Sequence, residues 1–244
     1  MVLAVLGVGV GSFLNVVIDR VPHKVPLRGP HEGEVVPPRE PLGVPLQPWV
    51  LRGGRAGGEP LPVRWLLVEL ATALVFGILG AVHGDRLTVL PLLVLGAALV
   101  AVSVVDLQLM RIPDRITFPA LALAVPTVLV VSVHYDVTDA FRGALIGAAA
   151  YFVLLFVPHL VYPRGMGFGD VKLALLMGLF LGWVGWRSDQ PVAGPLQMVL
   201  YGLMLGCVLG VVFGVVSQLV TRRRGEFPFG PALALACLAL VVTS

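Results

Sequence analysis

The chain has 244 residues, of which 57% are apolar and only 13% are charged, and its mean hydropathy is +0.94. Because a soluble domain carries about 25% charged residues, this composition excludes an ordinary soluble protein and indicates a polytopic membrane protein. The net charge of +3 does not indicate nucleic-acid binding, since the positions of Lys and Arg matter in a membrane protein more than their total.

Eight apolar segments follow one another along the chain, and we expect each to form a transmembrane helix. The predicted fold class is therefore all-α, a polytopic membrane helical bundle of about eight transmembrane helices. The first segment has no basic residue before it, which argues against a cleaved signal peptide. The segments run over about residues 1–18, 65–82, 87–105, 116–133, 141–162, 171–186, 196–220 and 227–242.

The basic residues are distributed unequally between the two sides that these segments define. The loops and span edges after segments one, three, five and seven hold 14 of the 17 Lys and Arg residues, whereas those after segments two, four and six hold only Arg86, Arg142 and Arg187. The positive-inside rule places the basic set in the cytosol and both termini outside. We expect a multi-pass membrane protein that contacts lipid and binds no nucleic acid.

The first cytosolic loop, residues 19–63, differs in composition from the rest of the chain. It holds ten of the twenty prolines and a glycine-rich run at 53–58, which argues against long helices or central strands. A weakly structured loop on the membrane surface is the preferred interpretation, and a compact binding module is the alternative. The predicted organisation is a first helix at 1–18, this Pro/Gly-rich loop, and a seven-helix transmembrane core at 64–244.

Two acidic residues lie at the ends of apolar segments, where a carboxylate is energetically costly and suggests a functional site. Asp106 ends the third segment and Asp170 begins the sixth. The predicted topology puts both at the same depth on the cytosolic side. Two close carboxyl groups do not both ionise easily, so such a pair can act as general base and general acid in peptide hydrolysis. The alternative is that each is a solvated residue at a helix end.

The residues before Asp170 form the pattern Gly165-Met166-Gly167-Phe168-Gly169. Glycines let another backbone, such as an extended substrate, approach closely. We therefore assign Gly165, Gly167, Phe168 and Gly169 to the active-site loop.

Three further residues near these acids enter the candidate site. Pro113 ends a turn, and Asp114 is expected to be the N-cap of the fourth segment. Lys172 can pair with a carboxylate or extend to the lipid headgroups, and the second interpretation is preferred.

The remaining polar residues have simpler interpretations. Arg222, Arg223 and Arg224 are expected to anchor the chain on anionic lipid, and His159 to pack between helices. Both cysteines, Cys207 and Cys237, are expected to be small buried apolar residues. They form neither a disulfide framework nor a zinc site.

Together these residues resemble the bacterial prepilin peptidases, the type IV leader peptidases of the GxGD aspartic protease class. The matching blocks lie in the family's order over nearly the whole chain, at residues 11–18, at Asp106 with 112–114, at 165–173 and at 228–231. Leu67-Val68-Glu69-Leu70 resembles the opening of the family's second span.

The resemblance implies that Asp106 and Asp170 cleave leader peptides from type IV prepilins or type II secretion pseudopilins, at the cytosolic face of the bacterial inner membrane. It also implies, for many members, methylation of the new amino terminus by S-adenosylmethionine; proteolysis itself needs no cofactor. The chain lacks the two CxxC pairs that bind zinc in many members, so we expect no metal, and Asp19 stands where the family often has Tyr. Cleavage without methyl transfer is therefore the alternative activity. Two other classes fit less well: a proton-coupled transporter, which needs ionisable groups near mid-span, and an assembly factor with purely structural aspartates.

Overall fold

The computed structural model describes residues 1–24, 55–56, 59–60, 62–84, 87–163, 167–221 and 228–244. Within these ranges the chain forms eight helices and one pair of two-residue antiparallel strands, β1 (Arg55–Ala56) and β2 (Glu59–Pro60). The predicted all-α membrane bundle is confirmed. The division of the chain at residues 19–63 stays a prediction, because most of this loop lies outside the described residues.

The helices match the eight predicted apolar segments, with ends that differ by a few residues. Six of them, α1, α3, α4, α5, α6 and α8, are long and apolar enough to cross a membrane, while α7 has 17 residues and α9 has 14. The bounds are α1 Val2–Arg20, α3 Val63–His83, α4 Val89–Leu109, α5 Asp114–His134, α6 Thr138–Val161, α7 Phe168–Val184, α8 Ala193–Thr221 and α9 Gly230–Thr243.

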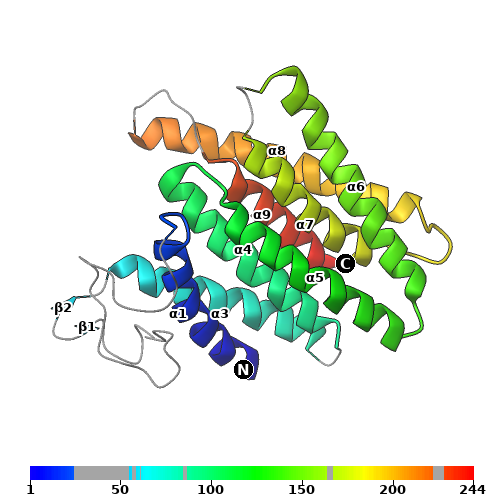
Figure 1. Cartoon of the computed structure of the whole chain (residues 1–244), viewed down its shortest axis with the longest axis horizontal. Helices are drawn as coiled ribbons and strands as arrows, with labels where there is room; N and C mark the ends of the chain where they lie inside the picture. Colours follow the sequence, from blue (N-terminus) through cyan, green and yellow to red (C-terminus); the bar gives the residue numbers. More distant parts are fainter. Residues whose placement is uncertain (25–54, 57–58, 61, 85–86, 164–166, 222–227) are drawn as a thin grey trace.

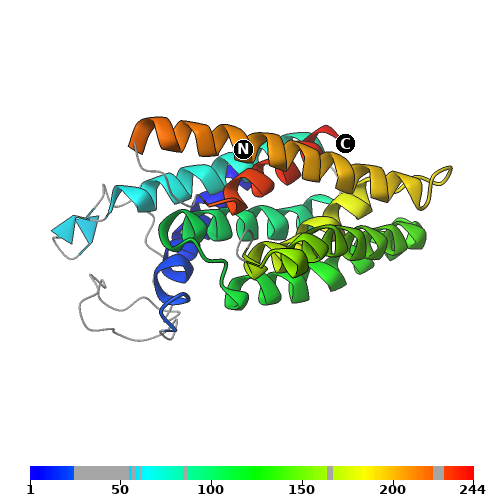
Figure 2. The ribbon, with the colours of Figure 1, turned by 90° about the horizontal axis from the view of Figure 1, so that it is seen from above.

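Helix α4 lies in the middle of the bundle and is the most buried of the six long helices. It contacts α1 and α3 on one side, α5 on another, and α7 and α9 on the third. Figure 1 shows α9 between α4 and the pair α7 and α8, and Figure 2 shows the same helices from above. This arrangement brings the end of α4 beside the starts of α7 and α9.

The most extensive helix contact joins α6 to α7 and is made by glycines. Gly143 and Gly147 on α6 face Gly178 and Gly182 on α7, so that a Cβ on Gly147 would lie 2.4 Å from the carbonyl oxygen of Gly178. Each pair has the GxxxG spacing, which lets helix backbones approach closely in a membrane. The contact fixes α7, and with it Asp170, against α6.

Helices α1 and α3 also approach closely and bury polar side chains between them. A Cβ on Gly11 would lie 2.7 Å from the Cα of Glu69, and Glu69 itself is fully buried. Ser12, Asn15 and Thr72 are buried in the same helix pair. Such polar groups are costly inside a membrane, which marks this pair as more than a hydrophobic anchor.

The cysteine prediction holds for one residue and is wrong for the other. Cys237 on α9 is buried, whereas Cys207 lies on the exposed face of α8. An apolar span predicts a helix but does not show which of its faces packs against protein and which faces lipid. Arg222, Arg223 and Arg224 lie outside the described residues, so their anchoring role stays a prediction.

Candidate active site

Asp106 is in the last turn of α4 and is 5% exposed. Its Oδ2 accepts a hydrogen bond of 3.0 Å from the backbone N–H of Gly230, at the start of α9. Helix α4 ends just after it, with Met110 in the left-handed conformation (φ 49°). The carboxyl group therefore lies in a junction of two helix ends, although its own helix presents its negative end there.

Asp170 is in the first turn of α7, where its charge complements the positive end of the helix dipole. It is 9% exposed, and its backbone N–H donates to the carbonyl oxygen of Gly167 over 3.1 Å. Its Oδ1 is buried and has no hydrogen-bond partner among the described residues. Asp106 and Asp170 are close enough to interact electrostatically, so the structure brings together two carboxyl groups that are 64 residues apart in sequence.

The first turn of α7, which carries Gly169, packs against the connection between α4 and α5. A Cβ on Gly169 would lie 2.8 Å from the Cβ of Ile112 and 3.4 Å from its backbone. Only glycine permits this approach without displacing the connection. Gly167 is the N-cap residue of α7, and Gly165 lies outside the described residues.

Lys172 and Asp114 form an ion pair between the starts of α7 and α5. The Nζ of Lys172 lies 2.7 Å from both carboxylate oxygens of Asp114 and 4.8 Å above the ring of Phe168. The preferred interpretation, that Lys172 extends to lipid headgroups, is therefore wrong. The predicted N-cap role of Asp114 is also wrong: the N-cap is Pro113, and Asp114 is the first helical residue, with no side-chain capping bond.

Phe168 connects this ion pair to α6. Its ring lies 5.2 Å from the ring of His159 and 6.4 Å from that of Phe156. His159 thus packs against the active-site loop, as expected of a helix-packing residue. The aromatic contacts and the ion pair hold the first turn of α7 from both sides.

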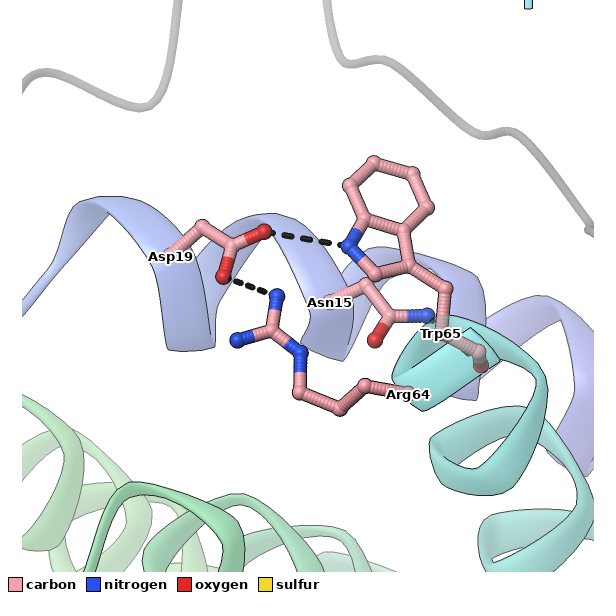
Figure 3. A network of polar contacts seen from close by, with 4 residues as sticks. All are labelled: Asn15, Asp19, Arg64 and Trp65. Carbon is pink, nitrogen blue, oxygen red and sulfur yellow. Dashed lines mark hydrogen bonds and ion pairs between the residues drawn. The ribbon is translucent and has the colours of Figure 1, made fainter. Parts of the chain in front are cut away.

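A second polar cluster joins the end of α1 to the start of α3 (Figure 3). Asp19 pairs with the guanidinium of Arg64 and accepts a hydrogen bond of 3.1 Å from Nε1 of Trp65. The side-chain amide of Asn15 donates to the carbonyl oxygen of Trp65 over 3.0 Å. The sequence interpretation assigned no function to this cluster, and it also missed Gly230. Gly230 belongs to the block at 228–231 that resembles the family, but its hydrogen-bond partner, Asp106, is 124 residues away in the sequence.

The carboxyl pair is suited to acid–base chemistry on a bound amide. One member receives a backbone hydrogen bond, and the other has a buried oxygen without a partner among the described residues. Two neighbouring carboxyl groups that share one proton provide a base and an acid together. Within the part of the chain that the structure describes, no cluster of three or more His, Cys, Asp or Glu residues has the arrangement of a metal site.

Comparison with known proteins identifies the family of the chain. A model of the type IV leader peptidase family matches residues 93–215, half of the chain and the part that contains both aspartates. The chain belongs to the type IV leader peptidase family. A model of the bacterial peptidase A24 N-terminal domain matches residues 5–83. By family the chain is thus a bacterial prepilin peptidase, and its apolar helices make it a multi-pass membrane protein.

Several curated relatives named prepilin leader peptidase/N-methyltransferase are similar to the chain. That of Myxococcus xanthus is 37% identical over 74% of the chain and 56% of its own length. Those of Aeromonas hydrophila and Pseudomonas putida are 30% and 32% identical, over 93% and 95% of the chain and 84% and 86% of their own lengths. No solved structure matches the chain.

Proposed function

We propose that this type IV leader peptidase hydrolyses the leader junction of prepilins or pseudopilins with Asp106 and Asp170, at the cytosolic face of the inner membrane. The observation that carries the proposal is that two mostly buried carboxyl groups, at the end of α4 and the start of α7, lie close enough to interact electrostatically. The enrichment of Lys and Arg on the same predicted side supports the cytosolic placement.

In the proposed reaction the two carboxyl groups act on one water molecule and one peptide bond. One aspartate takes a proton from the water as its oxygen attacks the scissile carbonyl carbon, and the other donates a proton to the carbonyl oxygen. The tetrahedral intermediate then collapses, the C–N bond breaks, and the amine leaves with a proton. Both carboxyl groups return to their starting states, so the peptidase needs neither a metal nor a covalent intermediate.

Proteolysis is tested by the intact mass of a purified prepilin after incubation with the full chain in lipid. Asp106→Asn and Asp170→Asn should each abolish loss of the leader mass. Asp189→Asn, at an exposed aspartate in the turn before α8, is the matched control and should cleave normally. If the two aspartates only stabilise helix ends, all three variants should cleave. That result would favour the alternative interpretation of the chain as an assembly factor with structural aspartates.

Methyl transfer to the new amino terminus is a second candidate activity, because the relatives' names include N-methyltransferase. S-adenosylmethionine supplies the methyl group in such a reaction and carries an ammonium and a carboxylate. In the cluster of Figure 3, Asn15 Oδ1 and Arg64 Nε are buried and lack hydrogen-bond partners among the described residues. An acceptor and a donor of this kind fit the two charged ends of such a molecule.

The same mass measurement tests this second activity, because added S-adenosylmethionine should increase the trimmed product by one methyl group. Binding is measured separately, by the fluorescence of Trp65 with and without S-adenosylmethionine in a variant whose other tryptophans are replaced by Phe. We expect Asn15→Leu to abolish the fluorescence change and leave cleavage intact. Trimming without methylation, together with an unchanged fluorescence signal, would identify a cleavage-only peptidase.

A further inference from the structure

The first residue of α9 lies directly against the carboxyl group of Asp106. Gly230 donates its backbone N–H to Oδ2 over 3.0 Å, and the hydrogen bond is buried. Residue 230 is buried, and the preceding residue, Phe229, is the N-cap residue of the helix. The contact joins the end of α4 to the start of α9. The α9 side contributes its backbone N–H, and the α4 side contributes the side chain of Asp106.

The space beside Asp106 is too small for a side chain at position 230 while Asp106 keeps its position. A Cβ there would lie 2.8 Å from Oδ2, 3.3 Å from Cγ and 3.5 Å from Cβ of Asp106. The aspartate would have to move to make room. Phe229 cannot retreat easily, because its ring already fills the space beside Gly210, where an added Cβ would lie 2.4 Å from Cε2. Helix α8 thus holds the start of α9 against Asp106.

This contact makes the two aspartates electrostatically unequal. The first N–H groups of a helix have no partner within the helix, and they carry the positive end of its dipole. The start of α9 therefore favours a negative charge on Asp106, which sits at the unfavourable end of its own helix. Asp170 also lies at the positive end of a helix, its own helix α7. Its Oδ1, however, is buried without a hydrogen-bond partner among the described residues, whereas Asp106 accepts the buried N–H of Gly230. A buried oxygen without a partner favours the neutral carboxyl group.

We propose that Gly230 is a positioning residue that holds Asp106 as the ionised member of the pair. Asp106 then takes the proton from the attacking water and later gives it to the leaving amine. Asp170 donates its proton to the carbonyl oxygen and recovers it as the C–N bond breaks. This inference rests on the proposed aspartic mechanism, and it adds which carboxyl group is the base and which backbone group orients it.

The sharpest test replaces the amide of residue 230 by an ester, by incorporating glycolic acid during cell-free synthesis of the full chain into nanodiscs. This change removes the N–H and adds no atom that crowds Asp106. Gly230→Ala is the second variant and tests the space. Gly206→Ala on α8 is the control, because its Cβ would lie 2.6 Å from a flexible methyl group of Leu233 on α9 and would not touch Asp106.

For each variant kcat and KM are measured on a prepilin, with inhibition by a junction analogue that carries a hydroxyl in place of the scissile carbonyl. The ester should lower kcat roughly 10- to 100-fold, the effect of losing a hydrogen bond to a charged group. KM should stay within about twofold, because the contact acts on the transition state. The analogue should bind more weakly in proportion to the loss of kcat/KM, and Gly206→Ala should retain the wild-type values.

The outcomes separate this inference from the mechanism on which it rests. If the wild-type chain cleaves, Asp170→Asn does not, and the ester variant keeps the wild-type kcat, then the role of Gly230 is refuted and the aspartic mechanism stands. If Asp106→Asn and Asp170→Asn both cleave, the mechanism fails and the assignment of Asp106 fails with it. A loss of kcat in the ester variant that Gly206→Ala does not share supports the proposal.

Discussion

The close contact between α6 and α7 predicts that a single methyl group will destabilise the fold. In Gly147→Ala the new Cβ would meet the carbonyl oxygen of Gly178 at 2.4 Å and the Cα of Gly182 at 2.6 Å. Both atoms belong to the backbone, so no side-chain rotation can relieve the contact. The two helices must separate by about 1 Å, enough to forfeit a quarter to a half of each dispersion contact along the interface.

The expected cost follows from comparison with a glycine that has no neighbour. Among the described residues, no atom outside the local backbone of α1 lies within 4 Å of the Cβ position of Gly9, so Gly9→Ala gains only the helix propensity of alanine, about 0.5–1 kcal/mol. Gly147→Ala gains the same amount and loses about 1–3 kcal/mol to overpacking. The difference between the two variants therefore isolates the overpacking term.

The assay is the reversible loss of helicity when SDS is titrated into the purified chain in mixed micelles. With equal slopes, the shift in midpoint gives the difference in unfolding free energy. Gly147→Ala should unfold at a lower SDS fraction than Gly9→Ala, by the equivalent of about 2 kcal/mol. Midpoints that agree to within about 0.5 kcal/mol would refute the proposed backbone contact between α6 and α7.

Two electrostatic predictions follow from the ion pairs at the helix ends. A double-mutant cycle of unfolding free energies with Asp114→Asn and Lys172→Met should give a coupling energy of about 1 kcal/mol. The ion pair is partly exposed, but the ammonium group of Lys172 also lies over the ring of Phe168. Single effects that simply add would contradict this prediction. Asp19→Asn should lower the unfolding free energy by about 1 kcal/mol through its weakened pairing with Arg64. Asp139→Asn, which breaks an exposed pair within one helix turn, should change it by less than about 0.5 kcal/mol, and equal effects of the two would argue against a stabilising role for Asp19.

The sequence predicted the helices well because a long apolar run inside a membrane has few alternatives to a helix. It placed the start of the sixth segment at residue 171, whereas α7 begins at Phe168. The first turn of that helix is polar and glycine-rich, so the hydropathy pattern excludes it. The same polar turn carries Asp170, and the error in the boundary therefore falls at the candidate site.

Contacts between distant segments were harder to predict. Nothing local in the sequence shows that Lys172 meets Asp114 or that Gly230 meets Asp106, since each pairing depends on how the helices pack. The α6–α7 contact was different, because the spacings Gly143-x3-Gly147 and Gly178-x3-Gly182 are visible in the sequence. That signal could have identified the helix pair and was missed.

Backbone contacts at glycines set the geometry of the candidate site on each of its sides. Gly230 brings α9 against Asp106, Gly169 brings the first turn of α7 against Ile112, and the α6–α7 glycines fix the rest of α7. On the glycine side each contact is made by backbone, and at Gly147, Gly178 and Gly182 the neighbouring atoms are backbone too, so these contacts leave little freedom for the helices that carry the two carboxyl groups. It follows that the site should tolerate changes among the apolar side chains around it better than the addition of one methyl group at Gly169 or Gly230.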